Sequence, residues 1–228
     1  MALGRERAPG GCRLDNSLVT TRRRPPQRPR RKAATTAGSA RGSLRVVAGS
    51  ARGRRLGVAA SSSNAGPATR PTSDRVREAV FNALESLGAV SGTRVMDAFA
   101  GSGALGIEAL SRGADHATFA EIDPAARSVV EANLAATGLA ERATVTGGDG
   151  ARTAATGGPW DLVLLDPPYA FDEWQALLAD VLPALAPDGV VMVESDREVV
   201  MPAGLVGIRT KHYGSTVVSF ATPAGATS

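Results

Sequence analysis

Cysteine, histidine and aromatic residues are all scarce in this chain of 228 residues. The single cysteine, Cys12, excludes disulfides and thiolate-rich metal sites, and the two histidines, His116 and His212, argue against a histidine-based zinc or iron site. No stretch approaches the roughly 18 uninterrupted apolar residues that a membrane span requires. We therefore expect a cytoplasmic protein in a reducing setting, with no metal and no membrane partner.

Charged residues are present in ordinary amount but are unevenly distributed. Hydrophobic residues make up 43% and charged residues 21%, as in soluble globular proteins, and the length allows one sizeable domain with extensions. The net charge is +4, yet residues 1–43 hold ten arginines and one lysine against two acids and so carry +9. The remainder therefore carries −5, and the body is mildly acidic.

The basic segment 1–43 is predicted to be disordered, because prolines interrupt its arginines and apolar periodicity is lacking. The favoured interpretation is a solvated charge run or an over-long start to the reading frame. A second interpretation is a nucleic-acid-binding arm, whose phosphate contacts would be sensitive to salt. An organelle transit peptide is a third, weakened by Glu6 and Asp15.

Ordered structure is predicted to begin near Leu44, where apolar residues on both sides of a glycine- and arginine-rich turn indicate a hairpin. The turn holds Arg52, Arg54 and Arg55. From Arg45 to Arg77 there are seven arginines and a single acid, so a phosphate-facing surface is favoured over a merely solvated hairpin. Residues 59–69 are predicted to form a flexible loop.

A helix is predicted after the hairpin, with Thr72 or Ser73 as its cap. Its apolar residues recur at helical spacing, so one face packs on the body. Off this stripe lie Arg75, Arg77 and Asn82. These three are either plain surface or line the approach to a site. Arg70, just before the helix, joins Arg75 and the hairpin arginines as a candidate phosphate contact.

Strands and helices alternate through the rest of the chain, which predicts a Rossmann-like α/β fold with a mainly parallel sheet and helices on both faces. The predicted strands are 94–99, 116–122, 143–146, 160–166 and 189–194, followed by a hairpin of 208–212 and 216–221. The predicted helices lie within 101–111, 124–136 and 171–185. The closing hairpin implies that the last strand runs antiparallel.

A glycine-rich turn follows the first predicted strand. Gly101, Gly103 and Gly106 have the spacing of a dinucleotide-binding loop, with a tight turn, a close ligand approach and close helix packing. Small-residue turns before helices are common, so this spacing alone is a weak signal. The acids that end the neighbouring strands make it more specific.

Three acids end three successive strands at one edge of the sheet. Asp97 can attract a cation, Glu121 can accept hydrogen bonds from ribose hydroxyls, and Asp149 can accept from an adenine amine. A helix cap or a surface acid is the alternative for each. Together they suit S-adenosylmethionine, which has adenine, ribose and a cationic amino-acid part. A nicotinamide dinucleotide competes for Glu121 and Asp149 but leaves Asp97 unexplained.

The tetrapeptide Asp166-Pro-Pro-Tyr169 follows an apolar strand at the same edge. The prolines withhold backbone donors, so the Pro167 carbonyl can point outward. Asp166 and that carbonyl can accept the two N–H groups of an exocyclic amine, while Tyr169 stacks on the ring. A strand-terminating turn is the alternative. Phe171 and Trp174 could wall a base pocket, but packing in the following helix is favoured.

Several of these stretches resemble the motifs of class I S-adenosylmethionine-dependent methyltransferases that act on exocyclic amines. They are Asp97-Ala-Phe-Ala-Gly-Ser-Gly-Ala-Leu-Gly106, Glu121, Asp149 and Asp166-Pro-Pro-Tyr169. Residues 70–82, the basic hairpin and the Tyr213-Gly214 turn are similar to those of RsmD-type small-subunit ribosomal RNA guanine-N2 methyltransferases. The resemblance covers residues 44–222; the basic segment before it is a departure, since the family usually starts at the hairpin.

We expect a methyltransferase domain over 91–222, an RNA-facing extension over 44–90, and disordered ends at 1–43 and 223–228. The resemblance implies a seven-stranded sheet. It implies methyl transfer from S-adenosylmethionine to N2 of a guanine in bacterial small-subunit (16S) ribosomal RNA, in an assembling particle, by a protein expected to be a monomer. The implied catalytic residues are Asp166, Pro167 and Tyr169. The implied cofactor-binding residues are Asp97, Gly101, Ser102, Gly103, Glu121 and Asp149. The implied RNA contacts are Arg52, Arg54, Arg55, Arg70 and Arg75.

Two other functions stay open. The same tetrapeptide chemistry serves a DNA adenine-N6 or cytosine-N4 methyltransferase, although the sequence lacks the additional target-recognition domain that such enzymes often carry. A non-catalytic ribosome assembly factor that binds S-adenosylmethionine or RNA as a scaffold is a different class. The complete set of cofactor and catalytic motifs argues against it.

Overall fold

The computed structural model describes residues 44–59 and 74–226. Several predictions lie outside these residues: those for the segment 1–43, for nearly all of the loop 59–69, for Arg70, and for the helix caps Thr72 and Ser73. Within the described residues, no helix is both long enough and apolar enough to cross a membrane.

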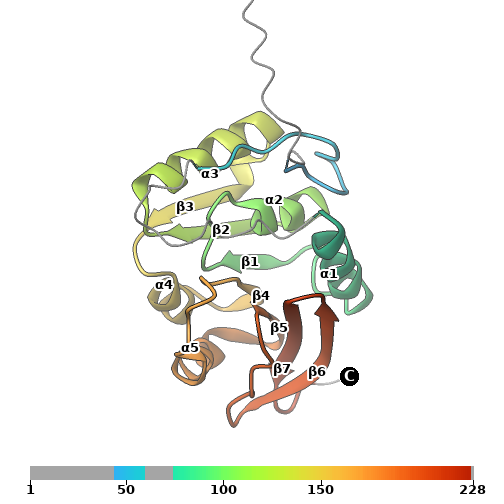
Figure 1. The fold of residues 1–228 in the computed structure, drawn as a ribbon, viewed down its shortest axis with the longest axis vertical. Helices are drawn as coiled ribbons and strands as arrows, with labels where there is room; N and C mark the ends of the chain where they lie inside the picture. The colour runs from blue at the N-terminus through green and yellow to red at the C-terminus, as the bar shows by residue number, and fades with distance from the viewer. Residues whose placement is uncertain (1–43, 60–73, 227–228) are drawn as a thin grey trace, which may run out of the picture. The chain divides into compact units, whose positions relative to one another are not determined.

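Seven strands form one sheet in the order β3-β2-β1-β4-β5-β7-β6 (Figure 1). Their bounds are β1 (Arg94–Asp97), β2 (His116–Glu121), β3 (Ala143–Gly147), β4 (Trp160–Leu165), β5 (Leu185–Ser195), β6 (Leu205–Tyr213) and β7 (Thr216–Pro223). The first five strands pair in parallel, and β7 runs antiparallel to both β5 and β6. The predicted Rossmann-like sheet with an antiparallel last strand is therefore confirmed.

Helices connect the parallel strands, as predicted, with one addition. Their bounds are α1 (Asp74–Ser86), α2 (Ala104–Ser111), α3 (Pro124–Thr137), α4 (Gly150–Thr156) and α5 (Trp174–Val181), with short 3-10 turns η1 (Ala140–Arg142) and η2 (Leu182–Ala184). The helix α4 was not predicted, because its seven residues offer little apolar pattern. The helix predicted to start at residue 171 begins at Trp174 instead.

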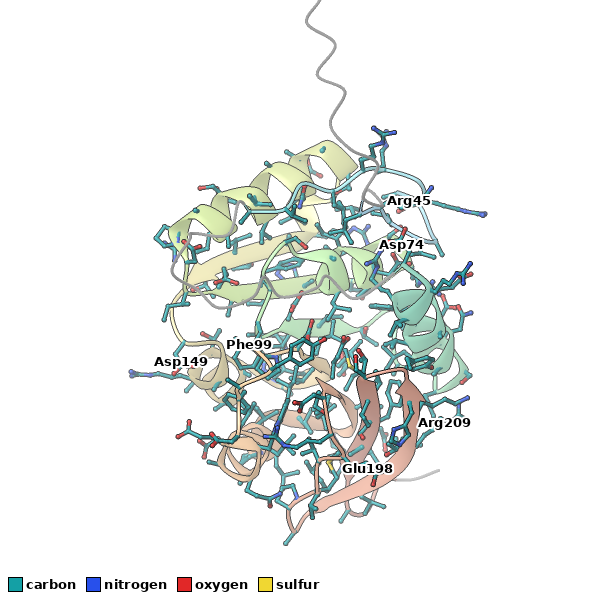
Figure 2. The ribbon with its side chains drawn as sticks, in the orientation of Figure 1. Arg45, Asp74, Phe99, Asp149, Glu198 and Arg209 are labelled. Carbon is teal, nitrogen blue, oxygen red and sulfur yellow. The ribbon has the colours of Figure 1, made fainter. Side chains whose placement is uncertain are left out.

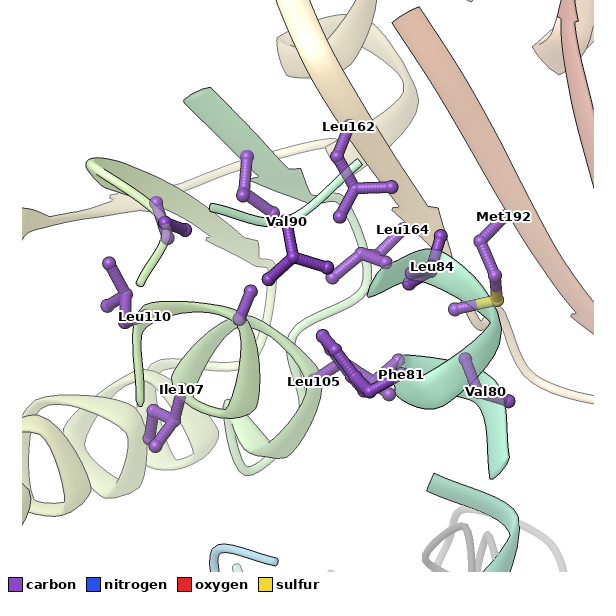
Figure 3. Packing of buried hydrophobic residues seen from close by; sticks show 14 of the residues in the cluster. Val80, Phe81, Leu84, Val90, Leu105, Ile107, Leu110, Leu162, Leu164 and Met192 are labelled. Carbon is purple, nitrogen blue, oxygen red and sulfur yellow. The ribbon is translucent and has the colours of Figure 1, made fainter. Parts of the chain in front are cut away.

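Side chains of each central strand alternate between two buried clusters, one on each face of the sheet. On one face, Leu162 and Leu164 pack with α1, α2 and α3. On the other face, Val163 and Leu165 pack with α4 and α5. Figure 3 shows the first cluster, in which Leu84 of α1 lies beside Leu164 and Phe81 lies beside Leu105. Because β4 is buried on both faces, its sequence is a continuous apolar run rather than an alternating one.

The predicted hairpin before α1 is present, although only one pair of residues, Arg45 and Arg55, forms a β-bridge. Backbone amides of Val46 and Leu56 donate to the carbonyls of Arg54 and Leu44 at 3.0 and 2.9 Å. Leu44, Val46 and Leu56 are buried in the same cluster as α1 and α2. The hairpin therefore shares a hydrophobic core with the sheet.

The C-terminal end of the sheet extends past the predicted limit at residue 222. The strand β7 continues to Pro223. The amide of Ala224 then donates to the carbonyl of Gly204 at 2.8 Å.

Candidate functional site

The parallel strands β1 to β4 all end at one edge of the sheet, where the loops that follow them come together. In open α/β sheets this carboxyl edge is where ligands bind. It carries the glycine loop after β1, Glu121 at the end of β2, Asp149 after β3, and the Asp166-Pro-Pro-Tyr169 stretch after β4. The topology thus brings the predicted cofactor and catalytic stretches to the same edge.

The glycine loop after β1 has the geometry that its spacing predicts. Gly101 and Gly103 have φ of 55° and 77°, in the left-handed region that favours glycine. A Cβ on Gly106 would meet the Phe119 ring at 2.3 Å, so the glycine lets α2 lie against β2. At Gly101 a Cβ would meet nothing closer than 4.0 Å, and this residue is exposed. The loop therefore offers backbone to solvent at Gly101 and packs tightly at Gly106.

Asp97 ends β1 but points into the protein, where it is only 1% exposed. Its Oδ2 accepts a hydrogen bond from the amide of Gly106 at 2.9 Å. Burial raises the pKa of Asp97 from 3.8 to about 7 and the charge of Glu121 raises it too, while hydrogen bonds from the amides of Gly106 and Phe99 oppose the rise. This carboxyl holds the glycine loop through the amide of Gly106. A nearby cation would stabilise its ionised form.

Glu121 links the first two loops of the edge. Its Oε2 accepts from the amide of Gly101 at 2.8 Å, and its Oε1 accepts from the amide of Asp123 at 2.9 Å. The side chain is half-buried. Each carboxylate oxygen can accept more than one hydrogen bond, so these contacts leave acceptor capacity for hydroxyl groups.

Asp149 is exposed and caps the helix that was not predicted. Its Oδ1 accepts from the amides of Ala151 and Arg152 at 2.8 and 3.4 Å. A helix cap was the alternative given for this acid, and Asp149 does cap α4; its role toward the cofactor remains a prediction. A Cβ on Gly150 would lie 1.6 Å from the carbonyl oxygen of Ala98, so only glycine lets α4 approach the end of β1 this closely.

The Asp166-Pro-Pro-Tyr169 stretch leaves β4 as a turn, with the amide of Phe171 donating to the carbonyl of Pro168 at 2.8 Å. Asp166 is half-buried, Pro167 is buried, and Tyr169 is 45% exposed. A large aromatic side chain that stays this exposed at the carboxyl edge can stack on a planar ring. The catalytic roles of these residues remain a prediction.

Aromatic rings connect this stretch to the glycine loop. The ring centroids of Phe99 and Phe171 lie 6.0 Å apart, and Phe171 meets Trp174 edge-on at 5.0 Å. Figure 2 shows Phe99 among the loops at the carboxyl edge, on the side toward Asp149. Trp174 is buried at 6% exposure, which confirms the expectation that these aromatics pack. The contact between Phe99 and Phe171 holds the two predicted halves of the site together.

Four of the five arginines predicted to contact RNA are described, and all four are exposed: Arg52, Arg54, Arg55 and Arg75. None of these four forms an ion pair with another described residue. Exposed cations without a carboxylate partner remain available to phosphates. Their contact with RNA remains a prediction.

The expectation for Arg77 is wrong. It was placed on the surface of α1 or beside the site, but it is fully buried. Its Nη2 lies 2.9 Å from Asp74 and its Nε 3.7 Å from Glu108, and it also donates to the carbonyl of Arg45. Arg45 in turn pairs with Asp74 at 3.1 Å (Figure 2). Two of its partners, Glu108 on α2 and the Arg45 carbonyl of the hairpin, lie on other segments, so the local sequence of α1 does not reveal them.

Glu108 was not among the predicted residues. Its carboxylate has no exposure and accepts from the amides of Val47 and Ala48 at 2.7 and 2.9 Å and from Arg112 Nε at 2.8 Å. The Oγ of Ser111, on the same helix, also accepts a hydrogen bond from the amide of Ala51 at 3.0 Å. The sequence signal was one acid in an otherwise apolar helix, which needs buried partners. These contacts fix the basic hairpin on α2.

The residues at the carboxyl edge fit S-adenosylmethionine. Gly101 offers open backbone, Glu121 retains acceptor capacity for ribose hydroxyls, and the buried Asp97 carboxyl would favour an ammonium nearby. Asp149 is exposed, so its second oxygen, Oδ2, is available to an adenine amine. Among residues 44–59 and 74–226, no group of three or more His, Cys, Asp or Glu side chains is placed to hold a metal ion.

Comparison with known proteins gives one consistent family. The family model described as "Conserved hypothetical protein 95" matches residues 44–222. The Bacillus subtilis protein YlbH is 38% identical over 77% of this chain and 97% of its own, and the Escherichia coli K12 ribosomal RNA small subunit methyltransferase D is 38% identical over 72% and 80%. The solved structure of Escherichia coli yhhF has a TM-score of 0.64 at 35% identity and covers 80% of this chain and 98% of that one. The chain therefore belongs to the Conserved hypothetical protein 95 family, the RsmD family that its motifs resemble.

Proposed function

We propose that this protein transfers a methyl group from S-adenosylmethionine to the exocyclic N2 of a guanine in small-subunit ribosomal RNA. Family membership supports ribosomal RNA methylation, because the relatives of this chain include proteins named ribosomal RNA small subunit methyltransferase D. The choice of guanine N2 rests on the resemblance of residues 70–82 and on the chemistry of the tetrapeptide.

One observation carries the proposal: the amine-holding tetrapeptide and the cofactor loop are neighbours. Phe99 lies between Asp97 and Gly101, and Phe171 lies two residues after Tyr169. Their ring centroids are 6.0 Å apart. A base held at the tetrapeptide would therefore lie beside a cofactor held at the glycine loop, as a direct transfer between them requires.

Asp166 and the Pro167 carbonyl perform the main positioning step in this proposal. The amine of guanine is a poor nucleophile, because its lone pair is delocalised into the ring. Two acceptors for its N–H groups would orient that lone pair and stabilise the positive charge that develops on nitrogen. S-adenosylmethionine supplies a methyl group that is already activated on a sulfonium. Asp166 need not act as a strong base, since a proton can leave after transfer.

Tyr169 holds the ring in this arrangement. Its exposure of 45% leaves its face available, and stacking of a base on an aromatic side chain is worth roughly 1–3 kcal/mol. The target base must leave its stack to reach the tetrapeptide. The exposed arginines of the hairpin and of α1 would hold phosphates of the surrounding RNA.

Incubation with labelled S-adenosylmethionine tests the function directly. Three substrates should be compared: deproteinised small-subunit ribosomal RNA, assembling small subunits and duplex DNA. Digestion to nucleosides should release N2-methylguanosine from one of the ribosomal substrates. N6-methyladenine or N4-methylcytosine from DNA would support the DNA alternative instead, and failure of a single turnover on every substrate would support a scaffold.

A further inference from the structure

Asn133 is a buried polar residue on α3, 4% exposed, that contacts two functional segments at once. Its Oδ1 accepts from the amide of Gly57 at 2.7 Å, and its Nδ2 donates to the carbonyl of Gly57 at 3.0 Å. The same Nδ2 donates to the carbonyl of Ser102 at 2.8 Å. One side chain therefore holds both backbone groups of Gly57 and one carbonyl of the glycine loop.

These two anchor points belong to the two binding surfaces of the protein. Gly57 lies two residues after Arg55, at the end of the basic hairpin, and Ser102 lies between the two left-handed glycines of the cofactor loop. A carboxamide is the side chain that can accept from one backbone group and donate to two others at once. A carboxylate would lose both donors, and an apolar side chain would leave these backbone groups of Gly57 and Ser102 without their side-chain partner.

Building on the proposed function, we propose that Asn133 is a positioning residue that couples RNA binding at the hairpin arginines to cofactor binding at the glycine loop. RNA that fixes the hairpin also fixes Gly57, and through Asn133 it restrains Ser102. The glycine loop is then already ordered when the cofactor binds, so cofactor binding loses less conformational entropy. Each ligand therefore raises the affinity for the other. The effect is reciprocal, because linkage makes the two changes in affinity equal.

Equilibrium binding measures this coupling without any methyl transfer. The probes are S-adenosylhomocysteine, which has no methyl group to give, and deproteinised small-subunit ribosomal RNA. In the wild-type protein, saturating RNA should lower the Kd for S-adenosylhomocysteine by at least about fivefold, at the lower end of typical coupling. In Asn133→Ala the ratio of the two Kd values should fall toward one.

Two further variants separate coupling from a general disturbance of α3. Asn133→Asp keeps the acceptor for the Gly57 amide but loses both donors, so it should also lose the coupling. Ser128→Ala is the matched control, because Ser128 is exposed on the same helix and its Oγ donates only to the Pro124 carbonyl at 3.1 Å. This control should keep the wild-type ratio.

The wild-type protein supplies a test that needs no substitution. Amide hydrogen exchange reports opening of the hydrogen bond from Gly57 to Asn133. Binding of S-adenosylhomocysteine alone should slow exchange at Gly57, although that residue lies in the hairpin segment. Unchanged exchange would overturn the coupling even if the Asn133 variants did not fold.

Failure of the coupling and failure of the proposed function give different results. If the wild-type protein binds both probes with no mutual effect, or if Asn133→Ala keeps the effect, the coupling is overturned and the function stands. If the wild-type protein binds S-adenosylhomocysteine but binds neither deproteinised ribosomal RNA nor assembling small subunits, the proposed substrate is wrong, and the coupling fails with it.

Discussion

Asp97 accepts a hydrogen bond from the amide of Gly106 at 2.9 Å while its carboxyl is 1% exposed. The end of β1 is thereby tied to the first turn of α2, across the whole glycine loop. Burial at this point destabilises the ionised form of the carboxyl. The size of this destabilisation depends on pH, because burial raises the pKa of Asp97 to about 7.

The first prediction concerns Asp97→Asn and pH. Between pH 3.8 and about 7, Asp97 keeps its proton in the folded state and loses it in the unfolded state, so its contribution to stability falls as pH rises through this window. The contribution of Asp97 to stability falls by roughly 4 kcal/mol at most, since each unit of pKa shift corresponds to about 1.4 kcal/mol. The asparagine variant lacks this titration. The free energy of unfolding of the variant, relative to that of wild type, should therefore increase between about pH 5 and about pH 8. Urea denaturation at each pH measures this difference.

Asp161→Asn controls for the exchange of a carboxylate for an amide, because Asp161 also accepts a backbone amide, that of Arg94, at 2.8 Å. A difference between Asp97→Asn and wild type that stays constant with pH would show that Asp97 is not the titrating group. Asp97→Asn should also bind S-adenosylmethionine more weakly at neutral pH and above, since the variant cannot offer a negative charge to the cation.

The second prediction concerns the amine-holding residue. Asp166→Ala should lower the rate constant of methyl transfer at least about a hundredfold, because it removes an acceptor that stabilises developing charge. The affinity for S-adenosylmethionine should stay near that of wild type. Single-turnover methylation and calorimetric binding measure the two quantities. Asp180→Ala, which removes an exposed carboxylate on α5, is the control, and substantial methylation by Asp166→Ala would remove this residue from the mechanism.

The third prediction concerns the hairpin arginines. Replacing Arg54 and Arg55 by Glu should weaken RNA binding and flatten the dependence of log Kd on log salt, because fewer phosphate contacts release fewer counterions. The matched control replaces both residues by Lys, which keeps the charge. Binding assays across a salt series distinguish the two. Equal slopes for the Glu and Lys variants would place the RNA elsewhere.

The fourth prediction concerns the anchoring of the hairpin. Glu108→Ala should lower the free energy of unfolding by roughly 3–5 kcal/mol, because Arg77, Arg112 and two amides lose a buried partner. Glu85→Ala removes an ion pair to the same Arg112 at 3.0 Å, but its side chain is 48% exposed, so the expected loss is about 1 kcal/mol or less. Similar losses for the two variants would contradict the anchoring role.

Part of the sheet could be predicted because some strands, such as β1 and β4, are short apolar runs that end at or just before an acid. The strand β4 and the Asp166 turn after it are an example, since both the run and its stop are local in sequence. The helix α4 could not be found in this way, because it is short and its cap, Asp149, also suited a ligand role.

The parts of the site that could not be predicted depend on distant partners. Arg77 looks like a surface residue until Glu108, 31 positions later, is placed beside it. Asn133 looks like an ordinary polar residue of an amphipathic helix, because nothing near it in sequence indicates Gly57, 76 positions earlier. Periodicity reports burial along one element, whereas these contacts arise from packing between elements.

The attachment of the hairpin at Glu108, Ser111 and Asn133 also bears on how RNA affinity can change. The three anchors hold backbone groups of the hairpin, so a hairpin taken from a relative would attach through the same contacts where α2 and α3 keep these three residues. The loop around Arg52 to Arg55 has no such constraint, since these arginines are exposed. We therefore expect chimeras that exchange the arginine turn alone to fold and to differ in how tightly they bind RNA.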